Sequence, residues 1–165
     1  MAQHGMTARD AGDGLVIRPR PAPDGALPSG ASLMAEVLAR LASLTDEARW
    51  REAAERLLRA ASGSRESLVQ SPLMLAAADL LERGAVIVIE GPLDDPVAQA
   101  LAAVALAAAD PAISVVRLDR ALWREGAPGG RPSLGVSPAA MMCRGQTCSL
   151  PVGTPDGLKA LVAKA

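Results

Sequence analysis

The sequence predicts an α+β protein in which a helical hairpin segment precedes a small α/β unit with a parallel βαβ crossover. Apolar residues recur at helical spacing from residue 32 to about 83. A continuous β-branched run then fills residues 85–89, the pattern of a strand buried on both faces. These patterns divide the chain into a lead-in loop (1–30), a helical segment (31–83) and an α/β unit (84–165).

The lead-in is rich in Gly, Pro, Asp and Arg, with RPRPAP at 18–23 and LPSG at 27–30. Such composition is typical of extended, loop-like chain. We therefore expect residues 1–30 to wrap around neighbouring elements rather than to fold alone.

The first helix is expected from Ser32 to about Leu44. Its apolar residues at helical spacing predict an inward face, and its polar residues predict the opposite face. The inward set is Leu33, Val37, Leu41 and Leu44, with Met34 and Leu38 beside it, and the outward set is Ser32, Glu36, Arg40 and Ser43. A second helix follows Thr45 and ends near Gly63, and the short turn between the two predicts an antiparallel αα-hairpin.

The remaining elements are indicated by capping residues and apolar runs. Ser71-Pro72 starts a third helix that ends near Arg83. Asp95-Pro96 starts the helix of the crossover, and residues 113–117 form its second strand. A weaker strand is expected at residues 139–143, and Thr154-Pro155 starts the last helix.

Composition argues against several classes of partner. The net charge is −1, Phe and Tyr are absent, and acidic and basic residues are interspersed. Such a chain offers neither an electrostatic field for phosphate backbones nor many aromatic platforms for bases, so we expect no nucleic-acid partner. The start lacks a signal-peptide pattern and no apolar run reaches the ~18 residues of a membrane span. We expect a cytoplasmic protein without a membrane partner.

Three stretches carry a resemblance to a known family. They are DGLVIRPRPAPDGALPSGASLMAEVLARL (13–41), AVIVIEG (85–91) and AAMMCRGQTCSLPV (139–152). In this order and spacing they resemble the C-terminal end of the thioredoxin-domain-containing proteins related to spermatogenesis-associated thioredoxin-like protein and bacterial YyaL. The resemblance covers nearly all of the chain.

The resemblance implies a place in a larger protein. In that family a thioredoxin-like domain precedes an α/α toroid similar to N-acylglucosamine 2-epimerases and six-hairpin glycosidases. This chain would supply the last toroid hairpin and a terminal α/β piece. We therefore expect a non-catalytic, uncharacterized C-terminal module, and the alternative is part of a carbohydrate-processing enzyme. The expected partners are the remainder of the parent protein, or a second copy bound through exposed helical faces.

The lead-in contains the candidate residues for the carbohydrate alternative. By resemblance, Asp10, Asp13 and Asp24 would skirt the rim of the toroid, where paired carboxylates serve as acid and base. Arg18, Arg20 and Ser29 could hold a sugar or an anion, or could equally tie the lead-in to a neighbouring helix. The simpler interpretation is that Asp residues in loops make turns.

The only two cysteines, Cys143 and Cys148, leave three interpretations open. Their gap is wider than the C-x-x-C of thiol-disulfide oxidoreductases, so we expect structural thiols rather than a disulfide or a redox pair. A metal site is not expected, because His4 is the one histidine and zinc needs four N or S ligands. The turn after residue 90 has a single Gly and two Asp, which disfavours a nucleotide, and no cofactor is expected.

Overall fold

A computed structural model describes residues 24–61, 69–119 and 134–164 of the chain. The chain divides into two compact units. The first comprises Met1–Ala42 and Glu47–Glu82, and the second comprises Ser43–Asp46 and Arg83–Ala165. Each unit is described on its own below.

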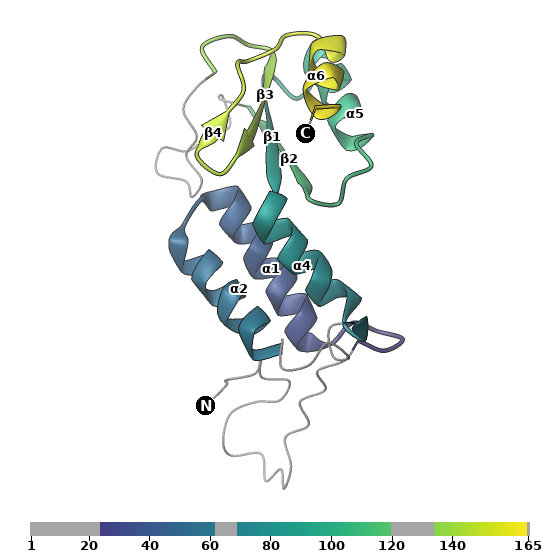
Figure 1. The fold of residues 1–165 in the computed structure, drawn as a ribbon. Coiled ribbons are helices and arrows are strands. Elements are labelled where there is room, and N and C mark those ends of the chain that lie inside the picture. Colours follow the sequence, from purple (N-terminus) through teal and green to yellow (C-terminus); the bar gives the residue numbers. More distant parts are fainter. Residues whose placement is uncertain (1–23, 62–68, 120–133, 165) are drawn as a thin grey trace, which may run out of the picture. The chain divides into compact units, whose positions relative to one another are not determined.

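Three helices make up the described part of the first unit: α1 (Gly30–Thr45), α2 (Ala48–Ala61) and α4 (Pro72–Arg83). They lie side by side (Figure 1). Their shared core is built from small and flexible side chains, with Ala35, Met74 and Ala77 buried at its centre and Ala31, Leu57, Leu58 and Ala61 packed against them. The helix ranges agree with those predicted, while the relation of these helices to a toroid stays a prediction.

The buried face of α1 differs from the predicted one. Leu33, Met34 and Val37 are 46%, 48% and 51% exposed, so the prediction of an inward face was wrong for these residues. The buried residues of α1 are instead Ser32, Ala35, Leu38, Ala39 and Ala42. Small side chains on this face allow neighbouring helices to approach closely. The polar side chain of Ser32 can be buried there because its hydroxyl accepts a hydrogen bond from the Ser29 hydroxyl.

The second unit is built on a four-stranded sheet of β1 (Ala85–Glu90), β2 (Ile113–Leu118), β3 (Ala139–Arg144) and β4 (Thr147–Cys148). The strand order is β2-β1-β3-β4. β1 and β2 are parallel, whereas β3 is antiparallel to both β1 and β4. Helix α5 (Pro96–Leu106) connects β1 to β2, and α6 (Pro155–Val162) follows β4. The predicted α+β class with a parallel crossover is confirmed.

Strand β1 forms the centre of this unit, and all six of its residues are buried. Helices α5 and α6 lie together over one side of the sheet (Figure 1). Ile87 and Ile89 pack on that side in one cluster with Leu101 of α5 and Leu158 of α6. The alternate residues Val86 and Val88 pack on the other side, with Leu118 and Leu44. The continuous β-branched run is thus explained by burial on both faces.

The turns of the second unit depend on a few specific residues. Gly91 follows β1 with a φ of +155°, and a Cβ there would lie 3.0 Å from Cβ of Pro138. The Asp95 carboxylate accepts hydrogen bonds from the backbone N–H groups of Val97 and Ala98 and so caps α5. Thr154 caps α6 in the same way. Both capping residues were predicted from the sequence.

In the three described stretches of the chain, no helix combines the length and the apolar character that crossing a bilayer requires.

Candidate functional site: a disulfide hairpin and an aspartate clasp

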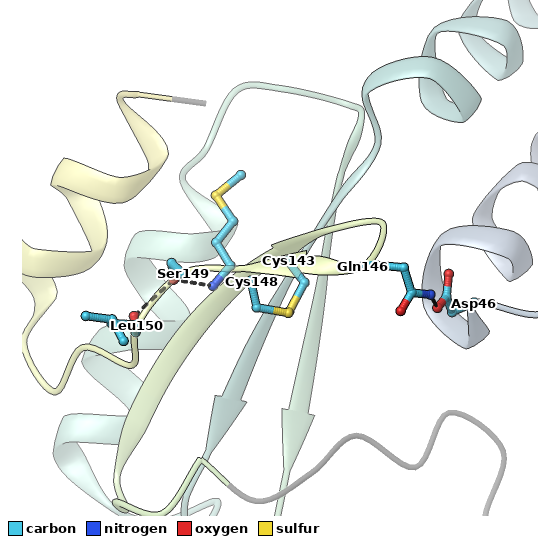
Figure 2. Close-up of a disulfide and its surroundings, with 7 residues drawn as sticks. Asp46, Cys143, Gln146, Cys148, Ser149 and Leu150 are labelled. Carbon is cyan, nitrogen blue, oxygen red and sulfur yellow. Dashed lines mark hydrogen bonds between the residues drawn. A yellow bond between two sulfur atoms is a disulfide. The ribbon is translucent and has the colours of Figure 1, made fainter.

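Cys143 and Cys148 are joined by a disulfide bond across the β3–β4 hairpin (Figure 2). The two residues are directly opposite each other in the antiparallel register, with their Cα atoms 4.0 Å apart. Arg144 pairs with Thr147, so only Gly145 and Gln146 form the turn. Gly145 has a φ of +53°, the conformation that glycine adopts most readily at the first position of such turns.

The hydrogen-bond pattern of the hairpin explains why the sulfurs meet. The Ser149 N–H donates to the carbonyl of Met142 at 2.8 Å, so Met142 and Ser149 form a hydrogen-bonded pair. Pairs alternate along an antiparallel ladder, which makes the Cys143–Cys148 pair a non-hydrogen-bonded one. Opposed side chains are closest at such pairs. The strand register therefore places the two thiols within bonding reach.

The disulfide contradicts the expectation of structural thiols, which was wrong. The four-residue gap is wider than that of the C-x-x-C redox motif, but comparison with that motif does not consider pairing across two strands. The informative signal was the segment CRGQTC, residues 143–148, where a glycine-containing pair of turn residues stands at the centre of a short hairpin. Two cysteines placed symmetrically about such a turn face each other across the strands.

The two halves of the disulfide differ in exposure. Cys143 is 2% exposed, whereas Cys148 is an exposed residue on the short outer strand. An open depression of about 450 Å³ adjoins Cys148. Arg144 and Lys164 both line it and supply positive charge. The disulfide lies on the opposite face of the sheet from this depression, because Cys143 is paired with Val86, whereas Met142, which lines the depression, is paired with Ile87 on the helix-covered face.

The tip of the hairpin has a contact of its own. The side-chain amide of Gln146 donates a hydrogen bond to the carboxylate of Asp46 (Figure 2). Asp46 belongs to the same compact unit and has a φ of 59°, a conformation that Asp tolerates better than most residues. The turn between the two cysteines is thus anchored to a residue far away in the sequence.

A second polar cluster surrounds Asp24, one of the residues predicted for a carbohydrate rim. Its carboxylate accepts from the backbone N–H of Ser29 at 2.8 Å and from that of Leu73 at 3.0 Å. The Ser29 hydroxyl accepts from the N–H of Ser32 at 3.1 Å, which makes Ser29 the N-cap of α1. Asp24 and Ser29 therefore satisfy backbone donors at the starts of α1 and α4.

These contacts set the ionisation of Asp24. Burial raises its pKa, but hydrogen bonds from the Ser29 backbone, the Ser32 hydroxyl and the Leu73 backbone outweigh burial and hold the pKa below the ordinary 3.8. A general acid would need the opposite shift. Asp24 is therefore an ionised side chain that joins the starts of α1 and α4 through hydrogen bonds. We call this arrangement the Asp24 clasp.

The other predicted rim residues, Asp10, Asp13, Arg18 and Arg20, lie outside the described residues. The structure thus brings together Asp24 and Ser29 from that set. Within residues 24–61, 69–119 and 134–164, no three His, Cys, Asp or Glu side chains are grouped so that they could hold a metal ion.

Sequence reasoning missed one buried carboxylate, Glu90 at the end of β1. The residue is 4% exposed, and its carboxylate accepts a hydrogen bond from the N–H of Leu134 at 3.0 Å. The available signal was its position between the buried run of residues 85–89 and Gly91. Glu90 holds the segment that leads into β3.

No protein-family model, no curated protein and no solved structure matches this chain. The resemblance to the thioredoxin-domain-containing YyaL group therefore stays a prediction. The disulfide hairpin and the exposed face of α1 are the features from which a function can be argued.

Proposed function

We propose that the chain is a non-catalytic module of a larger cytoplasmic protein, the C-terminal part of a thioredoxin-domain and six-hairpin glycosidase-like parent. The observation that carries the proposal is the apolar surface of α1. Leu33, Met34 and Val37 are each about half exposed, at positions that adjoin on one side of a helix. We call these three residues the α1 apolar face.

The α1 apolar face is the kind of surface that a neighbouring helix covers. Scattered exposed leucines are ordinary, but adjoining apolar side chains on one helix mark an interaction site. In an α/α toroid every hairpin packs against the hairpins on both sides, so a terminal hairpin keeps one face for its neighbour. The proposed occupant of the α1 apolar face is the preceding helical hairpin of the parent.

The coding sequence directly upstream provides the first test. We expect it to encode a thioredoxin-like domain followed by further helical hairpins. When the upstream toroid segment and the present chain are produced as two polypeptides, they should copurify. The double variant Leu33→Ser/Val37→Ser should lose that association, because it places hydroxyls in the apolar contact.

Leu106 provides the matched control for this experiment. It is 74% exposed on α5 and lies outside the α1 apolar face. The variant Leu106→Ser removes the same type of side chain and should leave copurification intact. If the chain alone is monomeric, binds no hydrophobic dye and fails to associate with the upstream segment, the module proposal is wrong.

A second candidate function is thiol–disulfide exchange through Cys143 and Cys148. The disulfide joins a buried residue, Cys143, to Cys148, an exposed residue on the edge strand of the sheet. In a cytoplasmic protein a disulfide is usually transient and is used for catalysis or sensing. The bond should therefore cycle between the oxidised and the dithiol form.

Thiol counting tests this second function. The folded chain should show two reactive thiols after treatment with a dithiol reductant and none after mild reoxidation. The circular dichroism spectrum should be unchanged between the two forms, which separates cycling from unfolding. A disulfide that resists reduction in the folded protein would contradict the redox function and leave the module proposal untouched.

The carbohydrate alternative has less support. Asp24 and Ser29 are engaged in helix capping, so a rim site would depend on Asp10, Asp13 and Arg18. Alanine at these three positions in the full-length parent should abolish sugar binding if the alternative is correct. Unchanged sugar binding would contradict the carbohydrate alternative.

A further inference from the structure

We propose that the disulfide of the β3–β4 hairpin is a redox-sensitive latch for Asp46. In the disulfide form the hairpin holds Gln146 where its side chain binds Asp46 (Figure 2), and in the dithiol form that contact is released. The inference rests on the second function proposed above, in which the bond cycles between these two forms. It adds the part of the molecule that responds to the cycle.

The disulfide and the segment that responds to it lie on the same face of the sheet. Cys143 is opposite Val86 in the register of β3 and β1, so both side chains lie on one face. Leu44 packs into the cluster of that face together with Val86. The segment Ser43–Asp46 belongs to the same compact unit as the sheet. The covalent bond is therefore placed on the side of the sheet that holds this segment.

A short length of strand pairing holds the tip of the hairpin. The Ser149 N–H donates a hydrogen bond to the Met142 carbonyl and fixes the base of the tip. Beyond this pair, the register contains two further pairs before the turn: Cys143 with Cys148, and Arg144 with Thr147. Two strands paired over so short a length are marginally stable in water. The disulfide joins the first of these pairs and keeps the turn closed.

Reduction lengthens the loop that carries Gln146. With the bond in place, the loop at the tip consists of residues 145–146, whereas in the dithiol form residues 143–148 are able to open as one loop. Closing a loop that is about three times longer lowers the population of a contact at its tip about fivefold. The contact between Gln146 and Asp46 is therefore weaker in the dithiol form.

Asp46 has a conformation that responds to the loss of a contact. Its φ is 59°, in the left-handed region, which residues other than glycine adopt at a cost and keep where contacts enforce it. The hydrogen bond from Gln146 is such a contact. When it is lost, we expect Asp46 to populate negative φ while Leu44 stays packed on the sheet. The chain passes back into the first unit at Glu47, so the redox state changes the backbone where the chain leaves the second unit.

The switching step uses a dithiol as its reductant. One thiolate of the reductant bonds to a protein sulfur, the Cys143–Cys148 bond breaks, and the electron pair leaves on the other protein sulfur, which takes up a proton. The second thiolate of the reductant then displaces the bound protein sulfur, which also takes up a proton, and closes a disulfide within the reductant. In total, the protein disulfide becomes two thiols and the dithiol becomes a cyclic disulfide.

NMR spectra of the full, isotope-labelled chain test the latch in the disulfide form and after reduction with dithiothreitol. The backbone shifts of Asp46 report its φ, and the side-chain amide signals of Gln146 report the hydrogen bond. We expect reduction to lower the population of the bound state about fivefold. The signals of Leu101, which is buried on the other face of the sheet, should stay in place and show that the fold is intact.

Variants of the hairpin isolate the contact from the bond. In the disulfide form of Gln146→Ala, Asp46 should already show the signals of the released state and should not respond to dithiothreitol. Gln99→Ala is the matched control, because Gln99 is an exposed glutamine on α5, outside the hairpin, and this variant should respond as the wild type does. Cys143→Ser/Cys148→Ser should show the released state with and without the reductant.

The outcomes separate the latch from the exchange function. Identical Asp46 signals in the disulfide and dithiol forms of the wild type would overturn the latch, while thiol–disulfide exchange itself would stand. A full response of Asp46 to reduction in Gln146→Ala would also overturn the latch, because the signal would then not pass through this contact. A disulfide that dithiothreitol does not open in the folded chain would overturn both the latch and the exchange function.

Discussion

The carboxylate of Asp24 accepts a hydrogen bond from the backbone N–H of Leu73 at 3.0 Å, across a sequence separation of 49 residues. The other carboxylate oxygen of Asp24 accepts from Ser29 directly before α1. One side chain thereby satisfies donors at the N-terminal ends of two helices, where the helix dipole also favours a negative charge.

The Asp24 clasp makes stability depend on pH. The folded pKa of Asp24 lies below the ordinary 3.8, so its contribution to stability is complete above that pH and is lost as pH falls through the folded pKa. Asp24→Asn keeps the size but not the charge. We expect it to cost about 1–2 kcal/mol at neutral pH, the range for loss of a helix cap.

Urea unfolding followed at pH 7 and at several lower pH values checks this expectation. The stability difference between wild type and Asp24→Asn should shrink as the pH falls below about 4. Asp156→Asn is the control, because Asp156 is an exposed aspartate in the first turn of α6. A constant difference across this pH range would contradict the clasp.

Gly91 should tolerate no side chain. A Cβ there would lie 3.0 Å from Cβ of Pro138 and 3.3 Å from Cβ of Ala98, and the φ of +155° is unfavourable for other residues. We expect Gly91→Ala to destabilise the fold by about 1–3 kcal/mol, as overpacking does in a dense core. Gly153→Ala is the control, because its nearest neighbour would be 3.7 Å from the new Cβ. Thermal unfolding of both variants decides the matter, and equal midpoints would refute the steric argument.

Two leucines on α5 provide a matched pair for the core of the second unit. Leu101 is 0% exposed and packs against the sheet, whereas Leu106 is 74% exposed on the same helix. Leu101→Ala should cost about 2–5 kcal/mol through lost burial and a residual cavity. Leu106→Ala should stay within about 0.5 kcal/mol of wild type. Similar losses for both variants in denaturant titrations would mean that α5 packs through a different face.

The disulfide should contribute modest stability, because it closes a short loop with a sequence separation of 5. Chain-entropy arguments for a loop of this size give about 2 kcal/mol. Unfolding with and without a phosphine reductant measures the contribution. Cys143→Ser/Cys148→Ser is the control, since its stability should not respond to reductant. A response of the double variant would show that the reductant acts elsewhere.

Local patterns predicted most of the secondary structure. The run of residues 85–89 anticipated β1, and Asp95 and Thr154 anticipated the starts of α5 and α6, because period and capping are properties of neighbouring residues. The strand order could be anticipated only for the crossover pair. The position of β3 on the other side of β1 depends on contacts between distant segments.

The misjudged features share one cause. The buried face of α1 contains the small residues Ala35 and Ala39 rather than the largest apolar side chains of the helix. The role of Asp24 depends on Leu73, and the disulfide depends on strand register across the Gly145 turn. Each of these is a tertiary relationship, which the spacing of residues in one segment does not contain.

The shortness of β4 has a consequence for aggregation. An outer strand normally offers a row of unpaired backbone groups on which a second chain can add a strand. In the described sheet the edge strand β4 has only two residues, and the disulfide of Cys148 joins it covalently to β3. This strand therefore leaves little length for intermolecular pairing. Fibril-like growth from this sheet would have to start at the opposite margin, β2, where Arg117 places an exposed charge on the strand.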